Sequence, residues 1–257
     1  MIPKIIHYCW FGGKKKPELA KKCIRSWKKY CPDYKIIEWN EENFDINYNA
    51  YVKEAYDSQK WAFVTDVVRL YAMVNFGGIY MDTDVEVLRP LDELLKYEAV
   101  SGFEDQEHIP TGLMACEKGH PLFTELLDEY KQLHFIKADG SLDLTTNVIR
   151  ITNACKKYGF TPNNPLQTIN GFTLLPNDYL CPKSYETGEI NLTENSYTIH
   201  HFNASWHSKA EKKAHNKRIN KMKRAEIKDY IIHIPNRLLM KCIGRNKYEN
   251  IKNKFNK

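Results

Sequence analysis

Residues 58–84 read SQKWAFVTDVVRLYAMVNFGGIYMDTD, and this stretch decides the fold. Its apolar residues recur at helical spacing and predict a helix that runs from Ser58, its expected N-cap, to about Asn75. A Gly-Gly pair then ends the helix, and the short apolar run behind it predicts a buried strand. The strand ends in two acids, Asp82 and Asp84. Helix and strand in this order indicate an α/β fold, in which ligands bind beyond the carboxyl ends of the strands.

The sequence before this stretch predicts a strand, a helix and a second strand. An apolar run rich in β-formers covers residues 2–10 and stops at the glycines at 12–13. A helix is expected over 17–30, starting at a proline, and a second β-like run covers 34–39. These elements have the size of a βαβ crossover, which implies a parallel sheet with helices on its faces. Trp10 follows the first strand and is therefore a candidate site residue.

The sequence after the central stretch predicts further strands and helices. Strands are expected at 85–88, 99–103, 112–116 and 198–202, and helices at 90–95, 121–134 and 145–158. Beyond Trp206 the pattern is helical, with isoleucines and leucines at 231–243 among many basic residues. The chain is therefore expected to form one α/β domain followed by a helical tail.

The distribution of charged residues also changes after residue 206. The 257 residues carry a formal net charge of +6, but residues 207–257 hold 16 Lys and Arg against 4 Asp and Glu, a net charge of +12. Residues 1–206 hold the other 22 basic and 28 acidic residues, a net charge of −6. We expect a domain over 1–206 and a basic helical extension over 207–257. A composition with 42% hydrophobic and 27% charged residues excludes disordered, collagen-like and coiled-coil proteins.

The same sequence predicts a cytoplasmic location. Charges interrupt every apolar run before it reaches the roughly 18 residues that a membrane span requires. The apolar start of the chain is too short for a signal peptide, and the lysine cluster lies behind it. Seven cysteines form no C-x-x-C pair, so reduced thiols are expected rather than a disulfide framework or a cysteine-ligated zinc.

Asp82 and Asp84 are the sharpest chemical signal. Carboxylates at i and i+2 of an extended segment point to the same side, so both can reach one divalent cation, and oxygen ligands suit Mg²⁺ or Mn²⁺. A cation held there would neutralise a pyrophosphate and stabilise a departing diphosphate. Acid-any-acid triplets also occur in solvated turns, but here an apolar strand delivers the acids to a strand end.

Two further clusters accompany these acids. Asp66 and Arg69 follow one stripe of the central helix and form either a surface ion pair or a pair beside the metal, where Arg69 could bind a phosphate or a sugar hydroxyl. His200 and His201 are neighbours in the last expected strand, so at most one of them can point into a shared site. An imidazole there can complete a carboxylate shell around Mn²⁺, and packing on Trp206 is the alternative.

Together these blocks resemble one enzyme family. They are IPKIIHYCWFGG at 2–13, A-x3-D-x2-R-x7-G-G-I-Y-x-D-x-D at 62–84 and IHHFNASW at 199–206. In this order they resemble the sugar-binding, DXD-containing glycosyltransferases of family 32, which include enzymes of capsular and surface polysaccharide synthesis. The resemblance covers residues 1 to about 206, and its central block is the most specific.

The resemblance implies a GT-A fold, a Rossmann-like α/β fold with a mostly parallel central sheet flanked by helices. It implies transfer of a sugar from a nucleotide sugar, most simply a UDP-sugar, to a glycan or lipid-linked glycan with retention of anomeric configuration. Mn²⁺ or Mg²⁺ is the implied cofactor. Family members often carry a Gly-Pro pair where this chain reads TTN at 145–147, so acceptor contacts do not carry over.

The resemblance also assigns roles to residues of the nucleotide site. Trp10 matches the residue that stacks on uracil, and Tyr80 matches one that lines the nucleotide pocket. Ser205 and Trp206 match a late segment that closes over the diphosphate.

The catalytic residues that the resemblance implies are Asp66, Arg69, Asp82 and Asp84. The first two match residues that hold sugar or ribose hydroxyls. Asp82 matches the acid that reaches ribose and sugar oxygens, often through the metal, and Asp84 matches the direct metal ligand. His200 is favoured as the third ligand because it follows Ile199 as in related motifs, and His201 is the alternative.

Two other functions compete with the transferase. A metal-dependent phosphohydrolase or nucleotidyltransferase could use the same acid pair, although phosphohydrolases with an aspartate nucleophile usually carry D-x-D after the first strand. A binding protein could act through the basic tail, which lacks zinc-finger and RNA-binding signatures, so no nucleic-acid partner is expected. Bases alternating with isoleucine and leucine fit a peripheral helix at the anionic inner face of the cell membrane, or a solvated helix that packs on its own domain.

Overall fold

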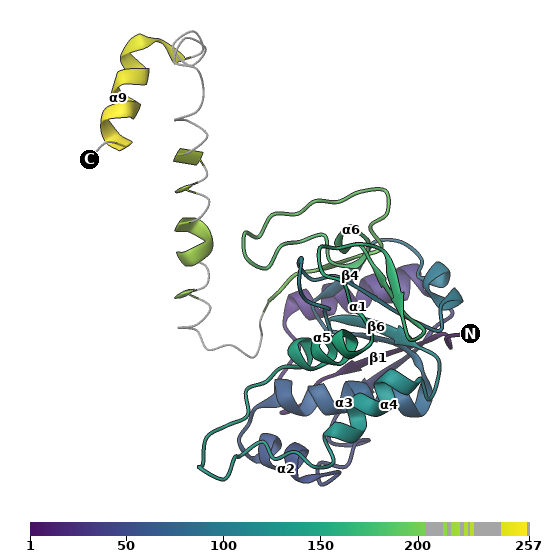
Figure 1. Cartoon of the computed structure of the whole chain (residues 1–257). Coiled ribbons are helices and arrows are strands. Elements are labelled where there is room, and N and C mark those ends of the chain that lie inside the picture. Colours follow the sequence, from purple (N-terminus) through teal and green to yellow (C-terminus); the bar gives the residue numbers. More distant parts are fainter. Residues whose placement is uncertain (204–212, 215–216, 222–223, 226, 229–242, 256–257) are drawn as a thin grey trace. The chain divides into compact units, whose positions relative to one another are not determined.

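The computed structural model describes residues 1–203, 213–214, 217–221, 224–225, 227–228 and 243–255 (Figure 1). The chain begins with the βαβ unit that the sequence predicts. β1 (Ile5–Cys9) and β2 (Lys35–Trp39) are joined by α1 (Glu18–Tyr30) and pair in parallel, with Ile5 opposite Lys35. The parallel pair needs a helical crossover because its strands run in the same direction.

A seven-stranded sheet in the order β2-β1-β3-β6-β5-β8-β7 forms the centre of the domain. Its remaining strands are β3 (Gly78–Met81), β5 (Ala99–Gly102), β6 (Leu113–Cys116), β7 (Gln167–Ile169) and β8 (Phe172–Leu175). β1, β2 and β3 are parallel, β6 is antiparallel to β3 and β5, and β8 is parallel to β5 and antiparallel to β7. Five strands therefore share one direction. The predicted α/β class, with a mostly parallel sheet flanked by helices, is confirmed.

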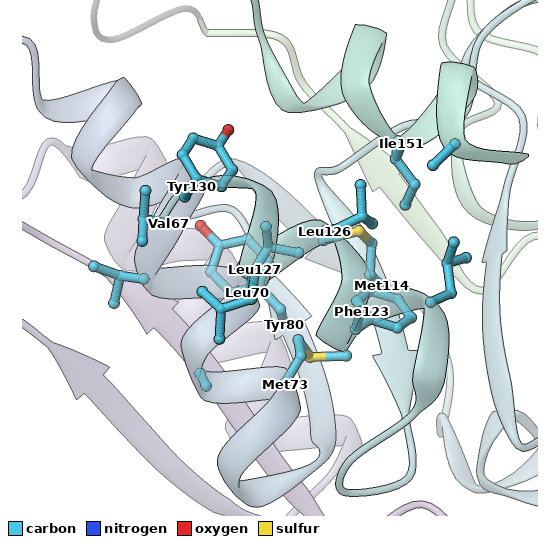
Figure 2. Packing of buried hydrophobic residues seen from close by; sticks show 14 of the residues in the cluster. Val67, Leu70, Met73, Tyr80, Met114, Phe123, Leu126, Leu127, Tyr130 and Ile151 are labelled. Atoms are coloured by element: carbon cyan, nitrogen blue, oxygen red, sulfur yellow. The ribbon is translucent and has the colours of Figure 1, made fainter. Parts of the chain in front are cut away.

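Apolar side chains cover both faces of this sheet. Along β3, Ile79 and Met81 belong to one buried cluster and Tyr80 to the other, because successive strand residues point to opposite faces. The first cluster includes residues of α1 and of a 3₁₀ helix, Asp92–Lys96. The second includes residues of α3 (Trp61–Phe76), α4 (Pro121–Glu129) and α5 (Asn147–Lys157), which pack as Figure 2 shows. The sheet is thus a buried layer between two helical layers.

A second, two-stranded sheet lies beside the first. β4 (Val85–Val87) follows directly on the Asp82 and Asp84 segment, and it pairs antiparallel with β9 (Thr198–His200). Thr198 contributes its hydroxyl to the carbonyl of Leu180, the last residue of α6 (Asn177–Leu180). This pairing brings the late part of the chain to the strand that the two acids introduce.

The helix expected from Ser58 is α3, and a shorter helix that the sequence does not predict ends just before it. α2 (Ala50–Asp57) begins at Asn49, whose side chain accepts a hydrogen bond from the Val52 amide, and Ser58 is its C-terminal cap. The prediction that Ser58 starts the long helix is wrong, and α3 begins after Lys60. Asn49 caps α2 by satisfying an otherwise free amide of its first turn, whereas no side chain caps the start of α3.

Four other elements differ from expectation. The sequence analysis did not predict β7, β8 or α6, and the helix expected over 121–134 ends at Glu129. β7 and β8 form a hairpin whose two connecting residues, Asn170 and Gly171, have φ angles of 49° and 78°. Asn-Gly is the pair that such a tight turn favours, so a local signal for this hairpin was present.

The chain divides into two compact units, residues 1–185 with 189–206, and residues 186–188 with 207–257. The second unit contains α9 (Arg245–Phe255). The apolar tail positions expected at 231–239 lie outside the described residues. No helix in the described part of the chain is both long and apolar enough to cross a bilayer. The six cysteines that can be described are buried and form no disulfide, and Cys242 lies outside that part.

Candidate active site

The two acids lie on a tight turn between β3 and β4. The Val85 amide donates to the Asp82 carbonyl at 3.0 Å, and the Asp82 amide donates to the Gly112 carbonyl at 2.8 Å. The segment expected to be extended is therefore a turn, and this expectation is corrected. Both carboxylates still lie close together, because a turn closed across four residues keeps its first and third side chains near each other.

The turn and β9 bring three potential metal ligands together. One ligand atom each from Asp82, Asp84 and His200 lie within 4.8 Å of one another. His200 Nε2 is 3.3 Å from Asp84 Oδ1, and the pairing of His200 with Val85 places it there. The other carboxylate oxygen of Asp84 accepts the Asn203 amide at 2.7 Å. Two carboxylates and an imidazole are a donor set that Mn²⁺ accepts.

His201 points away from this group. Its Nε2 is 2.8 Å from Glu86 Oε2, and the same carboxylate oxygen is 2.8 Å from Lys22 Nζ in α1. Neighbouring residues of a strand face opposite sides, so only one of the two histidines can face the acids. The structure places His200 beside Asp84 and His201 beside Glu86.

Asp66 and Arg69 form a buried pair next to the turn. Their exposed fractions are 7% and 5%, so the alternative of a surface ion pair does not hold. Arg69 Nη2 is 3.3 Å from Asp66 Oδ1 and 3.5 Å from Asp82 Oδ1, while Nη1 donates to the Thr111 carbonyl at 2.8 Å. Arg69 also lies over the ring of Tyr80, 4.7 Å from its centroid. The guanidinium therefore links the helix stripe to the acid turn.

The surroundings separate the pKa values of these carboxyls. Burial raises the pKa of Asp66 to about 6 even though Arg69 opposes this shift. Burial also raises the pKa of Asp82. Burial alone would raise that of Asp84, but the charge of His200 and the hydrogen bonds it receives bring its pKa down to about 2. The strong field of Asp84 in turn holds the pKa of His200 well above its usual value despite burial. Asp84 is thus a fully ionised carboxylate at neutral pH.

Of the four residues expected to contact the nucleotide, the structure describes Trp10 and Tyr80. Trp10 is half-buried at the end of β1, where its amide donates to the Trp39 carbonyl at 2.9 Å and Lys16 Nζ lies 5.7 Å from its ring centroid. Tyr80 is 1% exposed, and its hydroxyl donates to Asp82 Oδ1 at 2.8 Å. Ser205 and Trp206 lie outside the described residues.

Two further polar residues lie near the site, and the first of them, Asn147, was not predicted. Asn147 is 3% exposed; its amide donates to Asp66 Oδ2 at 3.3 Å and its side chain donates to the Asp66 carbonyl at 2.8 Å. Asn147 shares a helical stripe with buried Ile151, and a polar residue on an apolar stripe was the available signal. Glu104 is half-buried with a pKa raised by burial and lowered in part by the charge of His200.

A family model described as "Glycosyltransferase sugar-binding region containing DXD motif" matches residues 17–101. Residues 17–101 are therefore similar to the sugar-binding region of the DXD glycosyltransferases. The family resemblance drawn from the sequence is thereby confirmed. Asp66, Arg69, Asp82 and Asp84 all lie within the matched glycosyltransferase region, whereas Trp10 and His200 lie outside it.

Curated relatives are themselves glycosyltransferases. Inositol phosphoceramide mannosyltransferase 3 of Schizosaccharomyces pombe is 32% identical over 52% of this chain and 38% of its own length. Inositol phosphoceramide mannosyltransferase 2 of the same yeast is 26% identical over 81% of this chain and 59% of its own length. Human alpha-1,4-N-acetylglucosaminyltransferase is 26% identical over 67% of this chain and 48% of its own length. This chain thus spans between about two fifths and three fifths of the length of these relatives.

Solved glycosyltransferase structures also resemble this chain at low similarity. A glycosyltransferase involved in glycosylation of the major capsid of PBCV-1 covers 83% of this chain and 98% of its own, with 15% identity and a TM-score of 0.44. The alignment with the galactosyltransferase LgtC, in complex with donor and acceptor sugar analogues, covers 84% of this chain and 95% of LgtC. The identity is 12% and the TM-score is 0.41.

Proposed function

We propose that this chain transfers a sugar from a UDP-sugar to a hydroxyl of a glycan or lipid-linked glycan, with retention of anomeric configuration and with Mn²⁺ or Mg²⁺ at Asp82, Asp84 and His200. The observation that carries the proposal is the convergence of these three side chains at the end of β3, next to the Asp66 and Arg69 pair. The family match and the names of the relatives support the reaction class.

The donor set fits a divalent cation. Its ligand atoms lie within 4.8 Å of one another, and Asp84 offers a charged oxygen at neutral pH. His200, whose pKa is raised by Asp84, would release its proton on binding the cation. A cation bound there would supply Lewis-acid stabilisation of the negative charge that develops on the departing diphosphate. His200 and both acids would hold it, and Asn203 would keep the Asp84 carboxylate oriented through its amide.

Arg69 and Asp66 would hold the donor sugar. The guanidinium is fixed by the Thr111 carbonyl and by both acids, so it offers an oriented positive charge to a phosphate or hydroxyl oxygen. The backbone and side chain of Asn147 fix Asp66 from the other side. Fixed groups of this kind lower the barrier by holding the donor where the acceptor approaches it.

For the chemical step we propose that the acceptor oxygen attacks the anomeric carbon on the same face of the sugar from which the diphosphate leaves. The acceptor oxygen bonds to the anomeric carbon while the bond from that carbon to the diphosphate oxygen breaks. The acceptor proton passes to the departing diphosphate oxygen, so the step needs no enzymic nucleophile. The side chains nearest the acids support this route, because Asp66 is already paired with Arg69 and Asn147.

The biological setting is also a proposal. Enzymes of surface and capsular polysaccharide synthesis use acceptors that are often lipid-linked, and two of the relatives are named for a ceramide acceptor. We propose an acceptor of this class, reached at an anionic membrane surface through the basic residues of 207–257.

Nucleoside diphosphate release from a panel of UDP-sugars and GDP-mannose, with and without Mn²⁺, tests the reaction. We expect one donor to be turned over only with the metal. Asp84→Asn should lower turnover about 100-fold or more, because it removes a charged group that stabilises the transition state. Asp128→Asn, an equal loss of charge at an exposed position on α4, is the control. Turnover by Asp84→Asn at the wild-type rate, or inorganic phosphate as the product, would contradict the proposal.

A further inference from the structure

Gly112, which immediately precedes β6, lies against the imidazole of His200. A Cβ atom on Gly112 would lie 2.8 Å from both Cε1 and Nδ1 of that ring, closer than such atoms pack in proteins. The φ angle of Gly112 is not in the left-handed region, so its backbone can accommodate an L residue. Glycine is therefore required at position 112 because the imidazole ring occupies the space where a Cβ atom would lie.

Phe202 covers the ring of His200 from another direction. The two ring centroids are 4.1 Å apart at an interplanar angle of 32°. Phe202 has a φ of 54°, an uncommon conformation for a bulky residue, and such outliers persist where the surrounding structure holds them. The same turn brings the Asn203 amide to Asp84 Oδ2. The imidazole thus packs against both Phe202 and Gly112, with Nε2 3.3 Å from Asp84 Oδ1.

The backbone of Gly112 also holds a second ligand. Its carbonyl accepts the Asp82 amide at 2.8 Å and so fixes the first residue of the acid turn. The carbonyl of the preceding residue, Thr111, accepts from Arg69 Nη1 at 2.8 Å. One short backbone segment therefore contacts the arginine, the turn and the histidine, although it supplies no ligand atom of its own.

We propose that Gly112 is a positioning residue of the metal site: its carbonyl fixes Asp82, and its missing side chain admits the imidazole of His200. This inference rests on the proposed function, because it concerns the metal that Asp82, Asp84 and His200 would hold. An alanine at 112 leaves the carbonyl in place and removes only the space, so His200 is the group that has to move away from Asp84.

Mn²⁺ binding to the full chain, measured by calorimetry and by the paramagnetic resonance of free Mn²⁺, tests the positioning role. Gly112→Ala should weaken Mn²⁺ binding about 10-fold to 100-fold, as changes to residues that orient metal ligands do. Gly102→Ala is the matched control, because it lies on the neighbouring strand β5, has no left-handed φ and crowds only Leu175 and Leu180. Its Mn²⁺ affinity should stay within about twofold of wild type.

A second measurement does not depend on the metal. In the absence of added cation, Gly112→Ala should lower the melting temperature by about 2–10 °C, because it overpacks a buried site. The same substitution in a His200→Ala background should lower it much less, because the ring that it crowds is gone. This double-mutant cycle detects the packing of Gly112 on His200 even in a protein that binds no Mn²⁺.

The outcomes separate the inference from the proposed function. Loss of Mn²⁺ affinity together with a melting-temperature loss that His200→Ala relieves supports the positioning role. A melting-temperature loss of the same size in both backgrounds overturns it. Relief by His200→Ala without any change in Mn²⁺ affinity also overturns it, since Gly112 would then serve packing alone. A wild-type chain that binds no Mn²⁺ contradicts the proposed metal site, whatever the cycle shows.

Discussion

His200 and His201 are neighbours with opposite surroundings. One lies 3.3 Å from Asp84 and the other 2.8 Å from Glu86. We expect His200→Gln to weaken Mn²⁺ binding and donor turnover about 100-fold or more, because it replaces an imidazole ligand of the proposed site. The adjacent His201→Gln should leave both within a few fold, because its side chain faces Glu86 and Lys22. Equal losses in the two variants, measured by Mn²⁺ titration and diphosphate release, would contradict the placement of His200 in the site.

His7 predicts a dependence of stability on pH. Its Nε2 lies 2.8 Å from the Gly77 carbonyl, Nδ1 accepts from the Trp39 indole, and burial lowers its pKa from 6.5 to about 4. Between these values the unfolded chain binds a proton that the folded chain does not, so the free energy of unfolding falls as the pH falls from 6.5 towards 4. The contribution lost over this window is about 3 kcal/mol.

His7→Gln checks this prediction, because glutamine keeps a donor and an acceptor but does not titrate. Urea unfolding of the variant should show a shallower loss of stability between pH 6.5 and 4 than wild type. Parallel profiles for wild type and His7→Gln would show that His7 does not carry the effect.

Residues were predictable where the motif itself carried the chemistry. The sequence spacing predicted that four side chains on the helix and at the end of the next strand would lie close together. The structure brings them together: Asp66, Arg69, Asp82 and Asp84. Asn147 could not be placed in this way, because it approaches Asp66 from a helix 81 residues along the chain. Its contact depends on tertiary packing, which local sequence patterns do not encode.

At the scale of elements, the βαβ unit was predictable because strand and helix patterns of different period alternate along 40 residues. The start of α3 was not predictable, because Ser58 is a residue typical of an N-cap but ends α2, whereas Lys60 precedes α3 and makes no capping hydrogen bond with its side chain. The β7-β8 hairpin carried an Asn-Gly signal, but its strands are only three and four residues long. Such short strands resemble irregular chain in any periodicity argument.

The junction between α3 and β3 predicts a pronounced stability effect. A Cβ on Gly78 would lie 2.6 Å from the Ile5 carbonyl oxygen of β1, and Gly78 has a φ of 106°. Gly78→Ala should therefore lower the free energy of unfolding by about 3 kcal/mol or more. Gly13→Ala is the control, because Gly13 has a φ of 64° but no atom within 4 Å of an added Cβ, and it should cost about 1 kcal/mol. Denaturant unfolding of both variants measures the difference, and equal losses would show that close approach of β1 and β3 is unimportant.

At the scale of the whole molecule, the site combines residues that are far apart in the sequence of the first unit. The acid turn follows β3, but His200 and Asn203 come more than 100 residues later, held by the pairing of β9 with β4. A chain shortened before β9 would therefore keep the DXD motif and lose the imidazole. The motif and its family match within 17–101 thus describe only part of the proposed metal site.

The basic residues of 207–257 predict a second, separable property. With a net charge of +12 against −6 for residues 1–206, they should attract anionic lipid, at about 1 kcal/mol for each basic side chain near the surface. Ending the chain after Trp206 should abolish sedimentation with phosphatidylserine-containing vesicles while Mn²⁺ binding, which depends on residues 82–200, is retained. Binding of the full chain should weaken as salt is raised and be absent with phosphatidylcholine alone, because the attraction is electrostatic and screened. Undiminished vesicle binding by the shortened chain would assign the membrane contact to residues 1–206 instead.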